Sequence, residues 1–195
     1  MAEIQKPIQR STMRLKLDML YYGMLRRFLW IKMNKTFAAF QAEAKLPFSY
    51  FAHNTLLLRK LKDVDMWMQY NKITNLKIAT EKVNRIVLKP GNVFSFWKLI
   101  GKPTKRKGFV DGIILHNGSF HAGTGGGLCQ LSNLIFWMTL HTPLTVIERH
   151  RHGYDVFPDS NRTQPFGSGA TCFYPYGELM IKNAAIMMYS PFLSD

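Results

Sequence analysis

Residues 123–133 read Gly-Thr-Gly-Gly-Gly-Leu-Cys-Gln-Leu-Ser-Asn, so that three consecutive glycines lead directly into an apolar segment with helical spacing. Glycine permits close backbone approach, and the first turn of a helix carries N–H groups that have no intrahelical partner. Cys129 would lie in that first turn, where the positive end of the helix lowers the pKa of a thiol. We therefore treat this junction as the first candidate site.

The residues on both sides of the junction predict an α+β domain. Residues 129–141 form a pattern that is apolar on almost all sides, which is typical of a buried helix. Residues 109–116 and 119–122 have strand composition and flank Asn-Gly at 117–118, a preferred hairpin turn, and residues 145–148 form a further strand. We expect a mixed or antiparallel sheet packed on a buried central helix at about 129–141.

The N-terminal part predicts a basic helical region. Residues 12–34 show helical spacing, and residues 75–88 predict a second helix with Asn75 as its N-cap. We therefore divide the chain into a basic helical part at 1–74 and an α+β domain at 75–195. The first helix either packs its stripe on its own domain, which we favour, or lies on an anionic membrane. Its apolar stripe consists of Leu17, Leu20, Tyr21, Met24, Leu25 and Phe28.

The charge of the chain favours an anionic partner. The formal net charge is +14, and residues 1–62 contain 12 of the 26 Lys and Arg residues but 3 of the 12 Asp and Glu residues. Membrane surfaces, nucleic acids and anionic cell-wall precursors are all compatible with this charge. No nucleic-acid-binding motif accompanies it, so we expect no nucleic-acid partner. The alternative is the solvated face of a basic protein.

The N-terminal sequence and the cysteines bear on location. Residues 1–10 contain no apolar segment of the kind that a secretory signal needs, and no run of residues is long and apolar enough to span a bilayer. Cys129 and Cys172 can pair, but nothing else in the sequence indicates an oxidising compartment. We expect a cytoplasmic protein with free thiols, with peripheral attachment to a membrane as the alternative.

A cysteine nucleophile is one function that these residues permit. Cys129 needs a base, and His150 or His152 follows at the end of a predicted strand. Asp155 can orient that histidine, and Gln130 can donate a hydrogen bond to an oxyanion. The alternative is that Cys129 only packs in the core, as cysteines often do.

An anion-binding site is a second function that the pattern permits. Arg149 and Arg151 alternate along a strand and so share one face, where they can hold a carboxylate or a phosphate. The backbone N–H groups of Gly125, Gly126 and Gly127 suit the same ligand. In the alternative, the arginines tie the strand to a loop and the glycines serve close packing. Because no zinc-binding spacing is present, we expect neither a metal nor a cofactor.

Four pieces of the sequence, in this order, resemble the VanW family. The resemblance implies an accessory protein of B-type vancomycin resistance or of cell-wall maintenance that acts on an anionic peptidoglycan precursor. Cysteine chemistry is one mechanism, and a non-enzymatic binding or scaffold protein is the alternative. Family members continue with strand-like sequence where this chain ends, so we also expect a shortened C-terminal part. The pieces are Lys-Pro-Gly-Asn-Val-Phe-Ser-Phe (89–96), Gly-Gly-Gly-Leu-Cys-Gln-Leu-Ser (125–132), Glu-Arg-His-Arg-His (148–152) and Gly-Ser-Gly-Ala-Thr (167–171).

Overall fold

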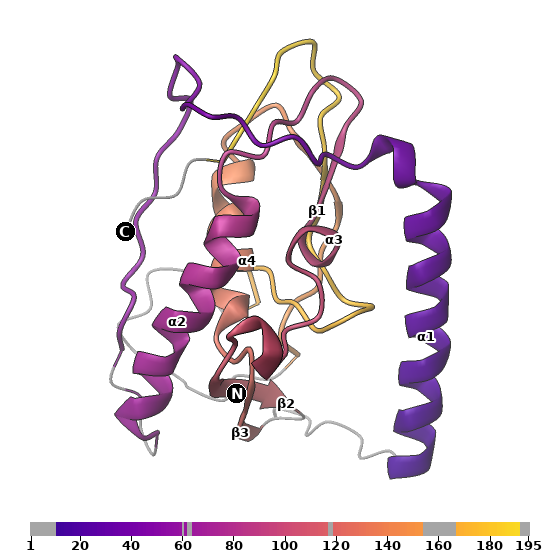
Figure 1. Cartoon of the computed structure of the whole chain (residues 1–195), viewed down its shortest axis with the longest axis vertical. Helices are drawn as coiled ribbons and strands as arrows, with labels where there is room; N and C mark the ends of the chain where they lie inside the picture. Colours follow the sequence, from indigo (N-terminus) through magenta and orange to yellow (C-terminus); the bar gives the residue numbers. More distant parts are fainter. Residues whose placement is uncertain (1–10, 60, 62–63, 117–118, 154–166, 192–195) are drawn as a thin grey trace, which may run out of the picture.

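The computed structural model describes residues 11–59, 61, 64–116, 119–153 and 167–191 (Figure 1). Helices alternate with short strands along the described chain. In order, the elements are α1 (Thr12–Lys32), η1 (Asn34–Thr36), α2 (Met66–Val83), β1 (Val93–Ser95), α3 (Phe96–Ile100), η2 (Lys105–Lys107), β2 (Asp111–His116), β3 (Ser119–Thr124), α4 (Leu128–Thr139), β4 (Thr145–Glu148) and β5 (Met180–Lys182).

The described chain forms an α+β fold with two antiparallel sheets, which confirms the expected class. One sheet has the order β1-β5-β4, so the last of these strands in the sequence lies at the centre. Ile181 of β5 pairs with Phe94 on one side and with Val146 on the other. The second sheet is the expected hairpin of β2 and β3. Its turn at 117–118 lies outside the described residues.

Helix α4 lies in the middle of the fold, as its apolar sequence indicated. Leu131, Ile135 and Phe136 are almost completely buried and belong to the same core cluster as Phe94 and Ile181 of the sheet. Glycine forms the start of this helix, since Gly127 is its N-cap with a φ of 93°. The helix therefore begins directly at the packed junction and presents its first turn to the segments around it.

Helix α2 begins and ends earlier than the helix that we expected at 75–88. Asn75 is therefore not its N-cap. Asn75 is fully buried in the middle of the helix. Its amide nitrogen donates to the carbonyl oxygens of Val110 and Gly126 at 3.0 and 2.9 Å, and its oxygen accepts from the N–H of Val110 at 2.9 Å. These long-range partners satisfy a polar side chain that would otherwise disfavour a helix interior. Positions 74 and 75, our expected domain boundary, lie within α2, and the division stays a prediction.

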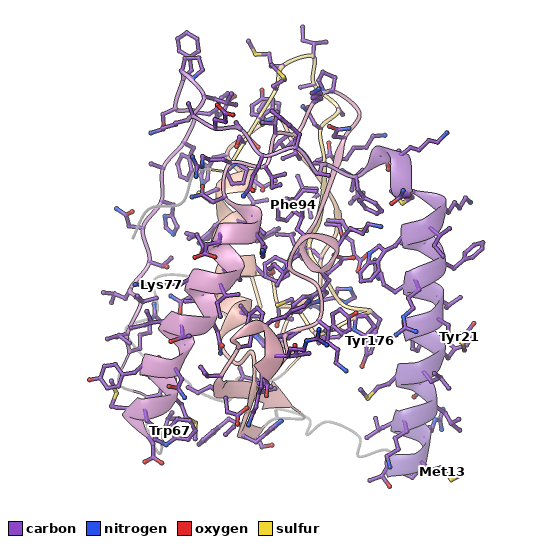
Figure 2. All side chains as sticks on the ribbon, in the orientation of Figure 1. Met13, Tyr21, Trp67, Lys77, Phe94 and Tyr176 are labelled. Carbon is purple, nitrogen blue, oxygen red and sulfur yellow. The ribbon has the colours of Figure 1, made fainter. Side chains whose placement is uncertain are left out.

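The apolar stripe of α1 is exposed, so our preferred interpretation of that helix as a core helix is wrong. The six stripe residues are each between 47% and 65% exposed, whereas Gly23 and Arg26 are the buried residues of the helix. Figure 2 shows α1 at one side of the molecule, with Met13 and Tyr21 directed away from the other elements. No described helix is long and apolar enough to cross a membrane.

Candidate functional site

The thiol of Cys129 lies among polar groups of a distant segment. Helix α4 places Cys129 in its first turn, half-buried, beside residues 171–172. The hydroxyl of Thr171 donates to the Cys129 sulfur at 3.1 Å, and the Sγ of Cys172 lies 3.9 Å away. Asn133, one turn further along α4, accepts a hydrogen bond from the N–H of Ala170 at 3.0 Å and so fixes the same segment.

These contacts shift the two thiols in opposite directions. The hydrogen bond with Cys172 is the largest influence that holds the pKa of Cys129 well below its usual range. Hydrogen bonds from His152 and Thr171 add to this effect, whereas burial opposes it. Burial raises the pKa of Cys172, and the neighbouring Cys129 raises it further. Of the two thiols, Cys129 is therefore the one whose thiolate form is favoured, and a thiolate is the reactive form of cysteine.

The structure separates the two histidines that we considered as the base. His152 interacts with the Cys129 thiol and contributes to the lowering of its pKa. His150 instead has its Nε2 2.9 Å from a carboxylate oxygen of Glu148, and its ring contacts Phe173 edge to face. Of the two, His152 is the one placed for proton transfer with Cys129. Asp155, the expected orienting carboxylate, lies outside the described residues.

The glycine N–H groups are engaged within the fold, which contradicts our expectation that they are free to bind an anion. Each donates a hydrogen bond of 3.0 Å to a backbone carbonyl oxygen. These bonds link the junction to β2, to the start of the hairpin and to the turn itself. For Gly125, Gly126 and Gly127 the acceptors are Val110, Gly123 and Ile113, respectively.

Close packing explains why glycine occupies these positions. A Cβ on Gly126 would lie 2.1 Å from the carbonyl carbon of Gly112, and a Cβ on Gly127 would lie 2.2 Å from the Lys72 side chain. Lys72 is buried and donates to Gln69 at 2.8 Å, and burial lowers its pKa to about 8. The junction thus locks α4, the hairpin and α2 together and fixes the position of the Cys129 turn.

The other predicted binding residues hold loops in place or lie at the surface. Gln130 donates to the carbonyl oxygen of Leu56 at 2.9 Å. The guanidinium of Arg149 donates to the carbonyl oxygens of Gly167 and Gly169 at 2.6 and 3.0 Å, and it also lies over the ring of Phe136. Arg149 therefore ties the strand end to a loop. Arg151 is exposed and can meet an anion from solvent.

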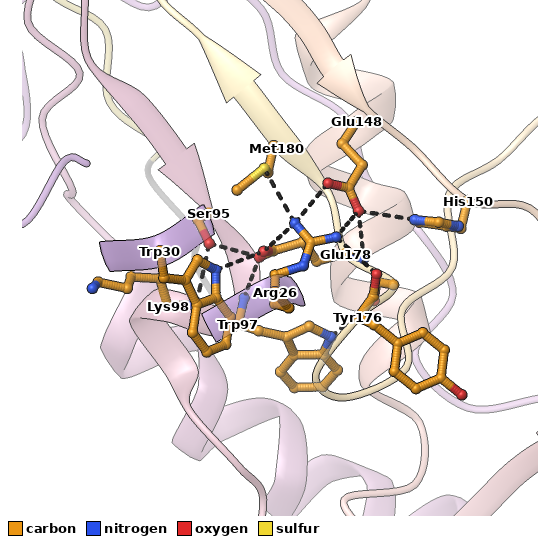
Figure 3. A network of polar contacts seen from close by, with 11 residues as sticks. Arg26, Trp30, Ser95, Trp97, Lys98, Glu148, His150, Tyr176, Glu178 and Met180 are labelled. Carbon is orange, nitrogen blue, oxygen red and sulfur yellow. Dashed lines mark hydrogen bonds and ion pairs between the residues drawn. The ribbon is translucent and has the colours of Figure 1, made fainter. Parts of the chain in front are cut away.

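A buried ionic network lies beside the site, and sequence reasoning missed it (Figure 3). Arg26 of α1 is paired with both carboxylate oxygens of Glu148, and its Nη1 lies 3.2 Å from a carboxylate oxygen of Glu178. Glu178 is fully buried and also accepts hydrogen bonds from the Ser95 hydroxyl at 2.6 Å and the Trp97 N–H at 2.8 Å. This network joins α1 to both outer strands of the β1-β5-β4 sheet, at Ser95 of β1 and Glu148 of β4.

The network sets the protonation of its two carboxylates and holds Glu148, the last residue of β4, beside His150. Burial acts to raise the pKa of Glu148, but His150 and Arg26 outweigh it, so the pKa is lowered. Burial raises the pKa of Glu178 despite its hydrogen bonds and the charge of Arg26. The carbonyl oxygen of His150 accepts from the N–H of Thr171 at 2.9 Å, so the network fixes the backbone beside Cys129.

Metal binding finds no support in the arrangement of side chains. Within the described ranges, no group of three or more His, Cys, Asp or Glu residues is placed to hold a metal ion. The Thr171 hydroxyl donates to the Cys129 sulfur at 3.1 Å, and the Cys129 thiol donates to the carbonyl oxygen of Cys172 at 3.4 Å.

The fold and these contacts define an α+β domain with a cysteine-centred polar site at the start of a buried helix. The chain belongs to the VanW family, since the model of the family described as "VanW like protein" matches residues 71–189. That match includes α4, the segment with His150 and His152, and the Thr171–Cys172 segment, and therefore all residues described around Cys129.

Two curated relatives are similar to the chain over part of their length. The "Vancomycin B-type resistance protein VanW" of Enterococcus faecalis is 39% identical over 141 residues, which are 72% of this chain and 51% of that protein. The "Uncharacterized protein YoaR" of Bacillus subtilis is 30% identical over 82 residues, which are 42% of this chain and 27% of that protein. The chain thus spans about half the length of the first relative or less than a third of the second. No solved structure matches the chain.

Proposed function

We propose that this protein is an accessory of glycopeptide resistance that acts on an anionic peptidoglycan precursor through Cys129. The similarity to a vancomycin B-type resistance protein supports the process. One observation supports the chemistry: the Cys129 sulfur receives hydrogen bonds from Thr171 and His152 beside a second thiol, in the first turn of a buried helix. Such surroundings stabilise a thiolate at neutral pH.

The proposed reaction is acyl transfer at an amide of the peptide stem. The Cys129 thiolate forms a C–S bond with the carbonyl carbon, the C–N bond breaks, and His152 gives a proton to the leaving amine. Water then forms a C–O bond with the acyl carbon while the C–S bond breaks, which releases a carboxylate and restores the Cys129 thiolate; one proton of the water restores His152 and the other is taken up by the released amine. The N–H of Gln130 already donates to the carbonyl oxygen of Gly127 at 3.0 Å, so the backbone N–H groups of Leu128 and Cys129 at the start of α4 are the ones proposed to stabilise the oxyanion.

A binding or scaffold protein without enzymatic activity is the second candidate. The exposed guanidinium of Arg151 favours it, because this side chain can hold a carboxylate of the peptide stem while Arg149 keeps the strand end in place. In this alternative, Cys129 contributes packing and hydrogen bonds to the segment at 171–172, and no bond is broken.

Peripheral contact with an anionic membrane fits the exposed surface of α1. This helix carries exposed apolar side chains along its length, including Leu20, Phe28 and Ile31, together with the basic residues Arg27 and Lys32. Apolar residues can enter the headgroup region while basic residues attract anionic lipids. Such contact would hold the protein near membrane-bound stages of cell-wall synthesis. A cytoplasmic location stays a prediction.

The test of the reaction is complementation in a bacterial strain whose glycopeptide-resistance cluster lacks its own VanW protein. We expect wild type to restore the inhibitory concentration of vancomycin and the pool of resistant precursors, and Cys129→Ala to restore neither. Thermal unfolding checks that the variant is folded. Arg151→Gln tests the alternative. If a folded Cys129→Ala restores full resistance while Arg151→Gln does not, binding rather than nucleophilic chemistry explains the function.

A further inference from the structure

A large apolar cavity lies on the side of α4 that includes Leu134 and Met138. Its volume is about 830 Å³. The segment at 45–54 forms one wall, α4 forms the second, and residues 186–191 form the third. Ligand pockets for small molecules have volumes of about 300–1,000 Å³, so this cavity is large enough to take most of a lipid chain.

The lining of the cavity is that of a site for a hydrocarbon chain. Leu134, Met138, Phe94 and Ile181 contribute apolar side chains from the helix and the sheet. The apolar lining is open to solvent, since Phe48 of the first wall is 89% exposed and Ile186, Met187 and Met188 of the third wall are 94%, 66% and 54% exposed. Exposed apolar surface that is continuous with a cavity favours a long apolar ligand over a small polar one.

The charged residues of the cavity are positive. Lys45 and Arg85 line it, and there is no Asp or Glu among the described residues in its walls. Arg85 is held in place by two hydrogen bonds: its guanidinium donates to the carbonyl oxygen of Glu43 at 2.6 Å, and its N–H donates to that of Pro191 at 2.8 Å. A fixed guanidinium beside apolar walls suits a carboxylate or phosphate head group.

We infer that this cavity binds a single-chain anionic lipid. The chain lies along Leu134 and Met138, and the head group lies between Lys45 and Arg85. The walls 45–54 and 186–191 meet through an edge-to-face contact of Tyr50 and Tyr189, whose ring centroids are 5.9 Å apart. The inference concerns a different set of residues from the Cys129 site and does not depend on chemistry there.

Fluorescence of cis-parinaric acid, which rises in apolar surroundings, provides the measurement with the full chain. Competitors with the same chain and different head groups then test the charge: dodecyl phosphate, dodecanol and dodecyltrimethylammonium, all below micelle formation. We expect dodecyl phosphate to displace the probe at a concentration about tenfold lower than the cationic competitor needs. Equal displacement by the cationic competitor would overturn the proposed head-group site.

Variants locate the binding. Ala52→Trp, on an exposed wall, and Leu134→Trp, on α4, fill the cavity and should abolish the fluorescence increase; the first keeps the test valid where the second does not fold. Lys45→Gln combined with Arg85→Gln should weaken dodecyl phosphate about fivefold or more but leave dodecanol unchanged. Lys77→Gln, exposed on α2, is the matched control.

Two results with these variants would overturn the inference. A third result separates the inference from the proposed reaction. Unchanged parinaric acid binding in folded Ala52→Trp places the probe elsewhere, and unchanged dodecyl phosphate affinity in the double variant removes the head-group site. Cys129→Ala should bind lipid as wild type does, because Cys129 does not line the cavity. Loss of resistance in Cys129→Ala with intact lipid binding, or the reverse, therefore distinguishes failure of one idea from failure of the other.

Discussion

The Sγ atoms of Cys129 and Cys172 lie 3.9 Å apart, and the pKa values of the two thiols move in opposite directions. When the pair loses one proton, the negative charge is therefore favoured on Cys129, where Thr171 and His152 also lower the pKa. A second negative charge on Cys172 would lie beside the first in a buried place, where like charges repel strongly. This asymmetry is the basis for our proposal that Cys129, rather than Cys172, is the nucleophile.

Alkylation of Cys129 should remain fast at pH values where an ordinary cysteine is unreactive. The rate follows the thiolate fraction, so we expect its midpoint to lie below about 8.5, the value for a free cysteine. Replacing His152 with Gln should move this midpoint upward. Iodoacetamide kinetics between pH 5 and pH 10, roughly the range in which thiols titrate, provide the measurement, with mass spectrometry to identify the modified residue.

His150→Gln is the matched control for this experiment. Because His150 contacts Glu148 rather than Cys129, the midpoint should stay where it is in wild type. An equal upward shift of the alkylation midpoint in both histidine variants would show that the polarity of the segment after β4, and not the contact with His152, sets the pKa of the Cys129 thiol.

Mild oxidation should join Cys129 to Cys172. A peroxide converts the Cys129 thiolate to a sulfenic acid and is itself reduced; the Cys172 thiol then attacks that sulfur, and water leaves as the disulfide forms. The sulfurs must approach from 3.9 Å to bonding distance, which requires only small side-chain movements. We expect the loss of both free thiols and of two hydrogens from the intact mass. In Cys172→Ser the sulfenic acid should instead be trapped by dimedone.

Arg26→Met should destabilise the protein by about 3–5 kcal/mol, because it leaves the fully buried carboxylate of Glu178 without its cation and leaves the half-buried Glu148 with His150 alone. Arg27 is the neighbouring residue on the exposed side of α1, and Arg27→Met should change the stability by about 0.5 kcal/mol or less. Urea unfolding followed by circular dichroism compares the two. Similar effects of both substitutions would mean that the ion pairs contribute little to the fold.

Gly126→Ala should destabilise the junction by about 1–3 kcal/mol or more, since the added carbon meets the Gly112 backbone at 2.1 Å and neither side can give way easily. Gly153 offers a control, because a Cβ there meets nothing within 4 Å. Gly153→Ala should be neutral or slightly stabilising. Thermal unfolding measures both variants, and a neutral Gly126→Ala would contradict the close packing of α4 on the hairpin.

Binding to anionic vesicles should depend on the apolar side chains of α1. We expect co-flotation with vesicles that contain phosphatidylglycerol and little with vesicles of phosphatidylcholine alone. Leu20→Ser with Phe28→Ser should reduce this binding, and both sites are more than half exposed, so the fold should tolerate the change. Binding that persists unchanged in this double variant would assign the contact to charge alone or to another surface.

The elements around the junction could be predicted because their signals are local. The apolar run of α4 and the Asn-Gly pair between β2 and β3 each specify their own structure over a few neighbouring residues. The orientation of α1 could not be predicted in this way. The buried face of α1 is the one that carries Arg26, whose partner Glu148 lies 122 positions further along the chain. An ion pair between residues so far apart leaves no periodic signal in the sequence of the helix.

The candidate site could be predicted in part. Of the two histidines that the sequence offered as a base, His152 is the one that interacts with Cys129. The sequence could not choose between them, because strand alternation predicts the face on which a residue lies and not the partner that it meets. The contacts of Thr171 and Cys172 depend on the packing of a loop on α4, and no spacing in the sequence indicates them. The glycine pattern was compatible with both ligand binding and close packing, and only the hydrogen bonds to Val110 and Ile113 decide between them.

The central position of β5 has a consequence for synthesis of the protein. Residues 93–95 and 145–148 leave the ribosome well before residues 180–182, yet they pair with β5 and not with each other. The growing chain therefore exposes the unpaired edges of β1 and β4 until β5 has been synthesised. The sheet then forms in a single late step. Premature termination before Met180 would yield a product with the hairpin and the helices but no completed sheet, which is a natural target for chaperones and proteases.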